Sequence, residues 1–298
     1  MIALFGPTGV GKTALAIALA ARLRAHGQQP VAVSADALQV YEGLEILSGA
    51  ADAHDRAQLE HRLLSFVPIG AQFSAGQYAE LAHAEIDSLL AQGRLPIVVG
   101  GTGLYLRAAL AQLSLKPPPA PGVRERWLGE LDRLGAAALH EVLSARAPEV
   151  AATIAPSDGH RIVRALELDE AGALSAPPER SELWTEATRH PTLLVGLVME
   201  REQLYAQINA RVDHMLAAGA EAEVRRAHAA GASVTARKAL GFDELLSGDV
   251  EAMKRHTRNY ARRQLTWMRK LPGLMTVDLG AQQTAEAAEI VAKRWLDG

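Results

Sequence analysis

The apolar run Ile2-Ala3-Leu4-Phe5 leads directly into Gly6-Pro7-Thr8-Gly9-Val10-Gly11-Lys12-Thr13. This octapeptide fits the pattern G-x-x-x-x-G-K-[ST] at every fixed position, between a strand-like run and an Ala/Leu-rich helical run. Glycines in such a loop let successive backbone N–H groups face an anion at the positive end of a helix. We therefore expect residues 6–13 to bind a diphosphate or polyphosphate. Lys12 would add a positive charge and the Thr13 hydroxyl would ligate Mg²⁺.

Length and composition narrow the class of protein. The chain has 298 residues, a net charge of −3 and no cysteine. The length allows one large domain or two modest ones, and the missing cysteines exclude disulfides, zinc–thiolate sites and cysteine catalysis. No apolar run approaches the ~18 residues of a membrane span, and no charged-then-apolar leader precedes the first strand. A cytoplasmic protein without a membrane partner is expected.

Strand-like and helical segments alternate along the first part of the chain. Apolar runs at residues 30–35 and 95–99 predict strands, and the pattern at 77–92 predicts a helix between them. This β-α-β alternation indicates the α/β class, with a P-loop parallel sheet flanked by helices. Ligands of such sheets bind at the carboxyl ends of the strands.

A proline-rich stretch at residues 116–122 indicates a domain boundary. Apolar residues at three- and four-residue spacing predict helices throughout 123–170, and Ala176-Pro177-Pro178 closes that section. A buried-type strand at 193–198 should rejoin the sheet, and the rest is predicted to be helical, including 202–217 and 250–270. The predicted domains are a P-loop catalytic core, residues 1–115 and 190–298, and an all-helical insertion, residues 116–189.

Polar residues follow two of the predicted strands at the edge where ligands bind. Asp36 comes directly after the strand at 30–35 and could be an indirect magnesium ligand, a general base or a helix cap. The polar residues that follow it suit a planar substrate. Thr102 follows the other strand in a turn whose paired glycines allow a ligand to approach the backbone closely. Strand-to-helix turns are often glycine-rich, so the neighbouring phosphate loop is what makes this turn a candidate.

Positive charge gathers near the end of the chain. Residues 254–270 hold seven lysines and arginines and no acidic residue. In a near-neutral protein, such a helix predicts a surface for nucleic-acid phosphates. Tyr260 and Trp267 share a face of this helix and could stack on bases or pack in the core, which we favour for Trp267. Arg211 lies on an amphipathic helix, and its spacing alone favours a solvated side chain.

These motifs together resemble the tRNA dimethylallyltransferases, also called tRNA isopentenyltransferases. The resemblance runs along nearly the whole chain and is most specific in Val99-Gly100-Gly101-Thr102-Gly103-Leu104-Tyr105 and Tyr260-Ala261-Arg262-Arg263-Gln264-Leu265-Thr266-Trp267. Members move a dimethylallyl group from its diphosphate to the exocyclic amine of the adenosine just 3′ of the anticodon. The resemblance implies dimethylallyl diphosphate and a tRNA anticodon stem-loop as partners, and a monomer of the bacterial type without a zinc finger.

The resemblance also implies a role for each site residue. Asp36 would accept the amine proton, while Lys12, Arg211, the loop amides and Mg²⁺ on Thr13 would stabilise the leaving diphosphate. Thr102 would orient the amine or the bridging oxygen. The residues implied to contact tRNA are Asp36, Ala37, Leu38, Gln39, Thr102, Arg124, His160, Arg161, Ile162, Val163, Arg164, Arg237, Arg258, Arg262, Arg263, Gln264, Trp267 and Arg269.

The chain departs from the family pattern in three places. Ala37 replaces a serine, Ser48-Gly49-Ala50-Ala51 replaces Thr-Ala-Lys-Pro, and Ala147 replaces an aspartate. These departures concern substrate contacts rather than the reaction. Two other enzymes share the phosphate loop: an ATP-using small-molecule kinase, which leaves the basic helix unexplained, and a free-adenine-nucleotide isopentenyltransferase, which does not need the basic insertion. A nucleotide switch or RNA-binding module without catalysis does not need the set Asp36, Thr102 and Arg211.

Overall fold

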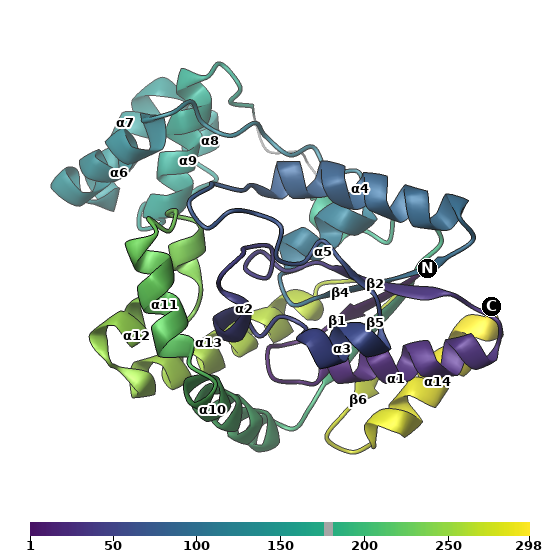
Figure 1. Cartoon of the computed structure of the whole chain (residues 1–298). Helices are drawn as coiled ribbons and strands as arrows, with labels where there is room; N and C mark the ends of the chain where they lie inside the picture. Colours follow the sequence, from purple (N-terminus) through teal and green to yellow (C-terminus); the bar gives the residue numbers. More distant parts are fainter. Residues whose placement is uncertain (176–180) are drawn as a thin grey trace. The chain divides into compact units, whose positions relative to one another are not determined.

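A computed structural model describes residues 1–175 and 181–298 of the chain (Figure 1). Within them, six strands form one parallel sheet in the order β3-β2-β4-β1-β5-β6. Adjacent strands run in register, so that Phe5 at the end of β1 lies opposite Gly100 at the end of β4. The strands are β1 Ile2–Phe5, β2 Pro30–Ser34, β3 His61–Arg62, β4 Leu95–Gly100, β5 Leu193–Val198 and β6 Met275–Asp278.

Helices cover both faces of this sheet. α1 (Lys12–Ala25) and α14 (Thr284–Leu296) pack together on one face, while α4 (Ala75–Ala91) and α5 (Gly103–Leu110) lie on the other (Figure 1). Because both faces are covered, β1 and β2 are buried along their whole length, which explains their uninterrupted apolar runs. Because these strands run parallel, the turns after β1, β2 and β4 lie at the same edge of the sheet.

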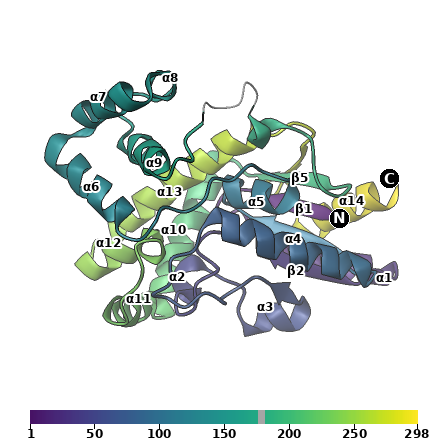
Figure 2. The same cartoon turned by 90° about the horizontal axis from the view of Figure 1, so that it is seen from above.

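Further helices stand at that edge. α10 (Arg201–Ala217) and α13 (Val250–Met268) lie side by side (Figure 2), and they are joined by a 2.6 Å hydrogen bond from Arg258 to Asn209. Three shorter helices pack near them: α2 (Glu45–Ser48), α11 (Ala220–Ala229) and α12 (Phe242–Ser247). A separate short helix, α3 (Ala53–Gln58), precedes β3. In the described part of the chain, no helix is long and apolar enough to span a membrane.

The main strands and helices confirm the sequence prediction, but two edge strands were not predicted. The prediction that the chain after residue 198 continues without a further strand is wrong, because Met275–Asp278 forms β6 beside β5. Only Val277 of this edge strand is buried, so it lacks the apolar run by which the central strands were found. The two-residue strand β3 was missed for a similar reason, since neither of its side chains is buried.

The described residues divide into two compact units. The larger one comprises Met1–Leu113 and Leu183–Gly298 and contains the sheet; the smaller one is Ser114–Glu182. The smaller unit has its own apolar core, which includes Trp127 and Leu143. The expected close of the helical section at 176–178 lies outside the described residues. The helices of the smaller unit are α6 Val123–Leu134, α7 Ala136–Arg146, α8 Pro148–Ala151 and α9 Gly159–Glu170.

The smaller unit corrects two of the predicted tRNA contacts. Ile162 and Val163 on α9 are 0% and 3% exposed and belong to the core of the unit, so their side chains cannot face RNA. Arg124 and Arg164 are only part-exposed, and both pair with the buried carboxylate of Glu167 at 2.6 and 3.0 Å.

Two predicted residues of this unit do face solvent. The Arg161 side chain is 74% exposed, with Asp158 at 3.4 Å, and His160 beside it is exposed as well. Their predicted contact with tRNA remains a prediction.

Candidate active site

The glycine loop, residues 6–13, connects β1 to α1. Gly9 and Gly11 adopt φ values of +82° and +97°, which only glycine adopts without strain. Gly11 precedes the first residue of α1, and the first turn of the helix contains no acidic side chain. The loop therefore presents backbone N–H groups at the positive end of a helix, an arrangement suited to an anion.

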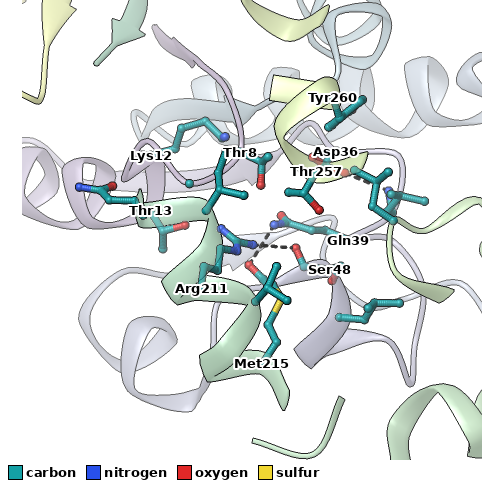
Figure 3. Close-up of a pocket in the computed structure, with 18 of the residues that line it drawn as sticks. Thr8, Lys12, Thr13, Asp36, Gln39, Ser48, Arg211, Met215, Thr257 and Tyr260 are labelled. Carbon is teal, nitrogen blue, oxygen red and sulfur yellow. Dashed lines mark hydrogen bonds between the residues drawn. The ribbon is translucent and has the colours of Figure 1, made fainter. Parts of the chain in front are cut away.

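The loop forms one wall of a cavity of about 410 Å³. Figure 3 shows Lys12, Asp36 and Arg211 among the side chains that line it, from three different segments of the chain. The glycine loop contributes polar backbone, and α10 and α13 contribute the facing wall. Part of the lining is apolar and would accept a hydrocarbon group beside the polar loop: Leu47, Ile208, Val212, Met215, Leu240 and Met253.

Asp36 lies just past the end of β2, at the cavity edge of the sheet. Its Oδ1 atom accepts a hydrogen bond from the backbone N–H of Leu38 at 3.0 Å. The helix-cap interpretation is wrong, because Asp36 is followed by a turn and the next helix, α2, begins only at Glu45. The two remaining alternatives, general base and indirect magnesium ligand, both suit a carboxylate that is held by one oxygen.

Two cations lie close enough to Asp36 to feel its charge. Burial lowers the pKa of Lys12 to about 8, an effect that Asp36 opposes. The Lys12 side chain is partly exposed, but its ammonium donates to the carbonyl oxygens of Gly6 and Pro7 at 3.0 and 2.9 Å. The glycine loop therefore surrounds the Lys12 ammonium, and both would bind the same phosphate.

Arg211 corrects the interpretation from spacing, which favoured a solvated side chain. Burial lowers the pKa of its guanidinium, and Asp36 opposes this shift. Its Nη2 atom donates to the carbonyl oxygen of Ser48 at 3.2 Å, and the guanidinium occupies the space that a Cβ at Gly49 would need. The absence of a side chain at residue 49 thus lets this arginine reach the cavity.

Thr102 is held against α13 rather than exposed directly in the cavity. It lies outside the set of described residues that line the cavity, but its Oγ1 is 3.2 Å from the hydroxyl of Tyr260, which does line it. Burial, together with the charge of Asp36, raises the pKa of Tyr260 to about 12. Tyr260 therefore stays protonated at neutral pH and can share a hydrogen bond with Thr102. Sequence reasoning had left Tyr260 as a stacking or packing residue.

The structure separates the α13 residues that were predicted to contact tRNA. Arg262, Arg263 and Arg269 are exposed, and their contact with RNA remains a prediction. Arg258 is half-buried and bonded to Asn209. Trp267 is half-buried against the ring of Trp184, with ring centroids 4.6 Å apart.

Gln264 lies on the buried side of α13. It is 4% exposed, and both ends of its amide are bonded to backbone groups at the glycine loop and at the turn after β4. Gln264 also lines the cavity, and its contact with tRNA remains a prediction.

The remaining residues that were predicted to contact tRNA differ in their position relative to the cavity. Leu38 and Gln39 line the cavity, whereas Ala37 lies outside the described lining. Arg237 is exposed and pairs with Asp243 at 3.3 Å.

The oxygen donors in the cavity fit a hard cation. The Thr8 and Thr13 side chains and Asp36 all line it, and hydroxyl and carboxylate oxygens are the ligands that Mg²⁺ prefers beside phosphate groups. The residues present therefore fit the expected metal.

The chain was compared with known proteins. A family model described as IPP transferase matches residues 39–271. The tRNA dimethylallyltransferase of Kineococcus radiotolerans is 40% identical over 284 residues, covering 91% of this chain and 88% of the relative. That of Thermobifida fusca is 39% identical over 283 residues, with the same coverage.

Solved structures show the same fold. The full-length tRNA isopentenylpyrophosphate transferase from Bacillus halodurans superimposes with a TM-score of 0.71 at 29% identity, covering 99% of this chain and 95% of that one. A eukaryotic dimethylallyltransferase acting on tRNA gives a TM-score of 0.77 at 23% identity, over 100% of this chain and 79% of that one. At that identity the second match concerns the fold alone.

Proposed function

The chain belongs to the IPP transferase family, and on this premise we propose that it transfers a dimethylallyl group from dimethylallyl diphosphate to a tRNA. The acceptor is the N6 amine of the adenosine 3′-adjacent to the anticodon, and diphosphate is released. One observation carries the proposal. A single cavity contains an anion-binding loop, two cations, a carboxylate and an apolar wall, which are the groups that a prenyl diphosphate and an amine acceptor require.

In this proposal the donor diphosphate binds at the glycine loop. The loop N–H groups and Lys12 attract its charge, and Arg211 reaches the same cavity from α10. These cations gain importance as the reaction proceeds, because the leaving diphosphate takes the electron pair of the breaking C–O bond. The prenyl group then lies against the apolar part of the lining.

Asp36 is the proposed general base. The N6 amine of adenine is a weak nucleophile because its lone pair is delocalised into the ring. As nitrogen forms its bond to the allylic carbon, the amine loses a proton, and the Asp36 carboxylate can accept it. Leu38 N–H holds Oδ1 of that carboxylate, and its other oxygen is the proposed proton acceptor. Thr102, bonded to Tyr260, is proposed to orient the amine or the bridging oxygen.

Mg²⁺ is the proposed metal. Thr13 would ligate it, with Asp36 nearby, and when bound it would neutralise charge on the diphosphate oxygens. The protein's own cations would share that task.

The acceptor adenosine has to leave its stack to reach the cavity. Leu38 and Gln39, which line the cavity beside Asp36, are proposed to hold the flipped base. The exposed arginines of α13 and the exposed Arg161 and His160 of the smaller unit are proposed to contact phosphates of the anticodon stem-loop. A tRNA substrate is consistent with the cytoplasmic location that we propose.

The direct test is incubation of the purified protein with dimethylallyl diphosphate, Mg²⁺ and unmodified tRNA, followed by mass spectrometry of the nucleosides. We expect a dimethylallyl group on one adenosine of the anticodon loop. Parallel reactions replace tRNA with adenosine monophosphate, or the prenyl donor with ATP. Prenylation of the free nucleotide alone would establish the free-nucleotide enzyme instead. ATP-dependent phosphorylation of a small molecule, without any prenyl transfer, would establish a kinase.

A further inference from the structure

Gln264 on α13 connects two segments that are far from it in sequence. Its Oε1 atom accepts a hydrogen bond from the backbone N–H of Thr8 at 2.8 Å, and its Nε2 atom donates to the carbonyl oxygen of Gly101 at 2.7 Å. Thr8 belongs to the glycine loop after β1, and Gly101 to the turn after β4. Since β1 and β4 are neighbours in the sheet, one side chain joins the two strand ends at the cavity.

The bond to Thr8 acts on the same peptide group as Lys12. The peptide between Pro7 and Thr8 donates its N–H to Gln264, while its carbonyl oxygen accepts from the Lys12 ammonium at 2.9 Å. The plane of this peptide is therefore fixed from both sides. Any shift of the Gln264 amide would rotate this peptide and move the oxygen on which the Lys12 ammonium rests.

The turn after β4 is shaped to receive this amide. A Cβ atom on Gly101 would overlap Nε2 of Gln264 and would lie 3.3 Å from the Lys12 nitrogen. The missing side chain at Gly101 is thus what lets Gln264, Gly101 and Lys12 meet. The amide is also shielded from solvent, with Gln264 only 4% exposed, and both of its ends have a partner of the matching polarity.

We propose that Gln264 is a positioning residue of the donor site, whose amide holds the glycine loop and Lys12 in the geometry that binds the diphosphate of the donor. This inference rests on the proposed function. It assigns Gln264 to donor binding and not to RNA recognition, although its neighbours Arg262 and Arg263 are exposed on the same helix. Gln264 does not take part in the chemistry; it acts through the loop and Lys12.

The test uses two variants of the full chain and a matched pair elsewhere. Gln264→Leu removes both hydrogen bonds. Gln264→Glu keeps the acceptor for Thr8 but replaces the donor to Gly101 by a carboxylate oxygen. The controls are Gln92→Leu and Gln92→Glu, the same changes at an exposed glutamine after α4, at the opposite edge of the sheet. Binding of inorganic diphosphate with Mg²⁺ is measured by calorimetry, the donor KM and the turnover rate are measured by steady-state kinetics, and binding of an anticodon stem-loop is measured at several salt concentrations.

We expect diphosphate binding to weaken by about two- to tenfold for each hydrogen bond lost, hence by roughly 5- to 100-fold in Gln264→Leu, which loses two. The donor KM should rise in step. The turnover rate at saturating donor should stay within a few-fold of wild type, so that the effect lies in the donor KM; a general loss of stability would instead lower the turnover rate with the fraction of folded protein. Stem-loop affinity and its salt slope should stay within twofold of wild type, and the Gln92 variants should match wild type in every measurement.

Wild-type diphosphate binding together with weakened stem-loop binding in the Gln264 variants would overturn the inference and return Gln264 to RNA recognition. If Gln264→Leu does not fold, Gln264→Glu and Gly101→Ala decide. The added Cβ of Gly101→Ala would displace the same amide, and it should weaken diphosphate binding likewise. If the wild-type protein binds diphosphate but prenylates no tRNA, the proposed function is wrong and the role of Gln264 in diphosphate binding is unaffected. The diphosphate measurement does not depend on prenyl transfer.

Discussion

Donor binding should depend on pH through Lys12. Burial lowers the pKa of the Lys12 ammonium to about 8, from 10.5 in an exposed lysine. A bound diphosphate brings negative charge to this group and raises its pKa again. The charged form of Lys12 therefore favours binding, and the neutral form does not. The affinity for the donor should be highest well below pH 8, and it should fall as the pH rises through 8.

The size of the effect follows from the titration of the free protein. With a pKa of about 8, the protonated fraction of Lys12 falls from roughly nine-tenths at pH 7 to roughly one-thirtieth at pH 9.5. If Lys12 remains protonated in the complex, the dissociation constant rises about 30-fold over this range, which corresponds to about 2 kcal/mol of binding free energy.

The assay is calorimetry of a non-reactive prenyl diphosphate analogue with Mg²⁺ between pH 7 and 9.5. Lys12→Arg supplies the baseline, because a guanidinium stays charged throughout and leaves only the donor's own titration. Lys12→Ala should bind weakly at every pH and lower turnover as well, since the charge is needed even more as diphosphate leaves. Equal slopes in wild type and Lys12→Arg would refute the assignment of this pH dependence to Lys12.

Three further substitutions test the other parts of the site. Asp36→Asn should leave tRNA and diphosphate binding within a few-fold of wild type and lower the single-turnover rate by about 10²–10⁴; an unchanged rate would exclude Asp36 as the base. Tyr260→Phe should slow transfer in wild type but not in a Thr102→Ala background, and a double-mutant cycle with additive losses would contradict the coupling that we infer from their contact. Arg262→Ala and Arg269→Ala should each flatten the log–log salt slope of stem-loop binding by about one unit, or somewhat less for loop phosphates, without weakening diphosphate binding. If the salt slope is unchanged in both variants, the side chains of Arg262 and Arg269 are solvated and do not contact RNA.

The central fold could be predicted because its signals are local. β1 is buried along its whole length and β5 over residues 195–197, and both appear in the sequence as continuous apolar runs. The glycine loop between β1 and α1 is recognised by its own motif. β6 was not predicted, because Val277 is the one fully buried side chain of this edge strand. The segment Met275-Thr276-Val277-Asp278 has only two apolar residues, too few to distinguish a strand from a loop.

The site was predictable to a smaller extent, because its decisive contacts join distant segments. Lys12 and Asp36 follow strands and could be placed at one edge of the sheet from the sequence. Arg211 could not, since an amphipathic pattern shows which face of a helix is apolar but not that an arginine beside that face will reach over Gly49 into a cavity. The resemblance to a family supplied its role where spacing had favoured solvent.

The charge pattern of the basic helix α13 predicts a role for its exposed side but not for its buried side. Buried residues recur on it at three- and four-residue intervals: Met253, Thr257, Ala261, Gln264 and Met268. Gln264 on this inner side bonds to both strand-end turns, and Tyr260 next to it contacts Thr102.

The arginines that drew attention to the helix lie mainly on its outer side. Because we propose a different partner for each face, substitutions at neighbouring residues should have different consequences. Changes on the outer face should weaken RNA binding and its salt dependence, while changes at Gln264 should weaken diphosphate binding. A helix that only bound RNA would not require a buried amide such as Gln264 bonded to two strand-end turns, whereas the role in the donor site that we propose does.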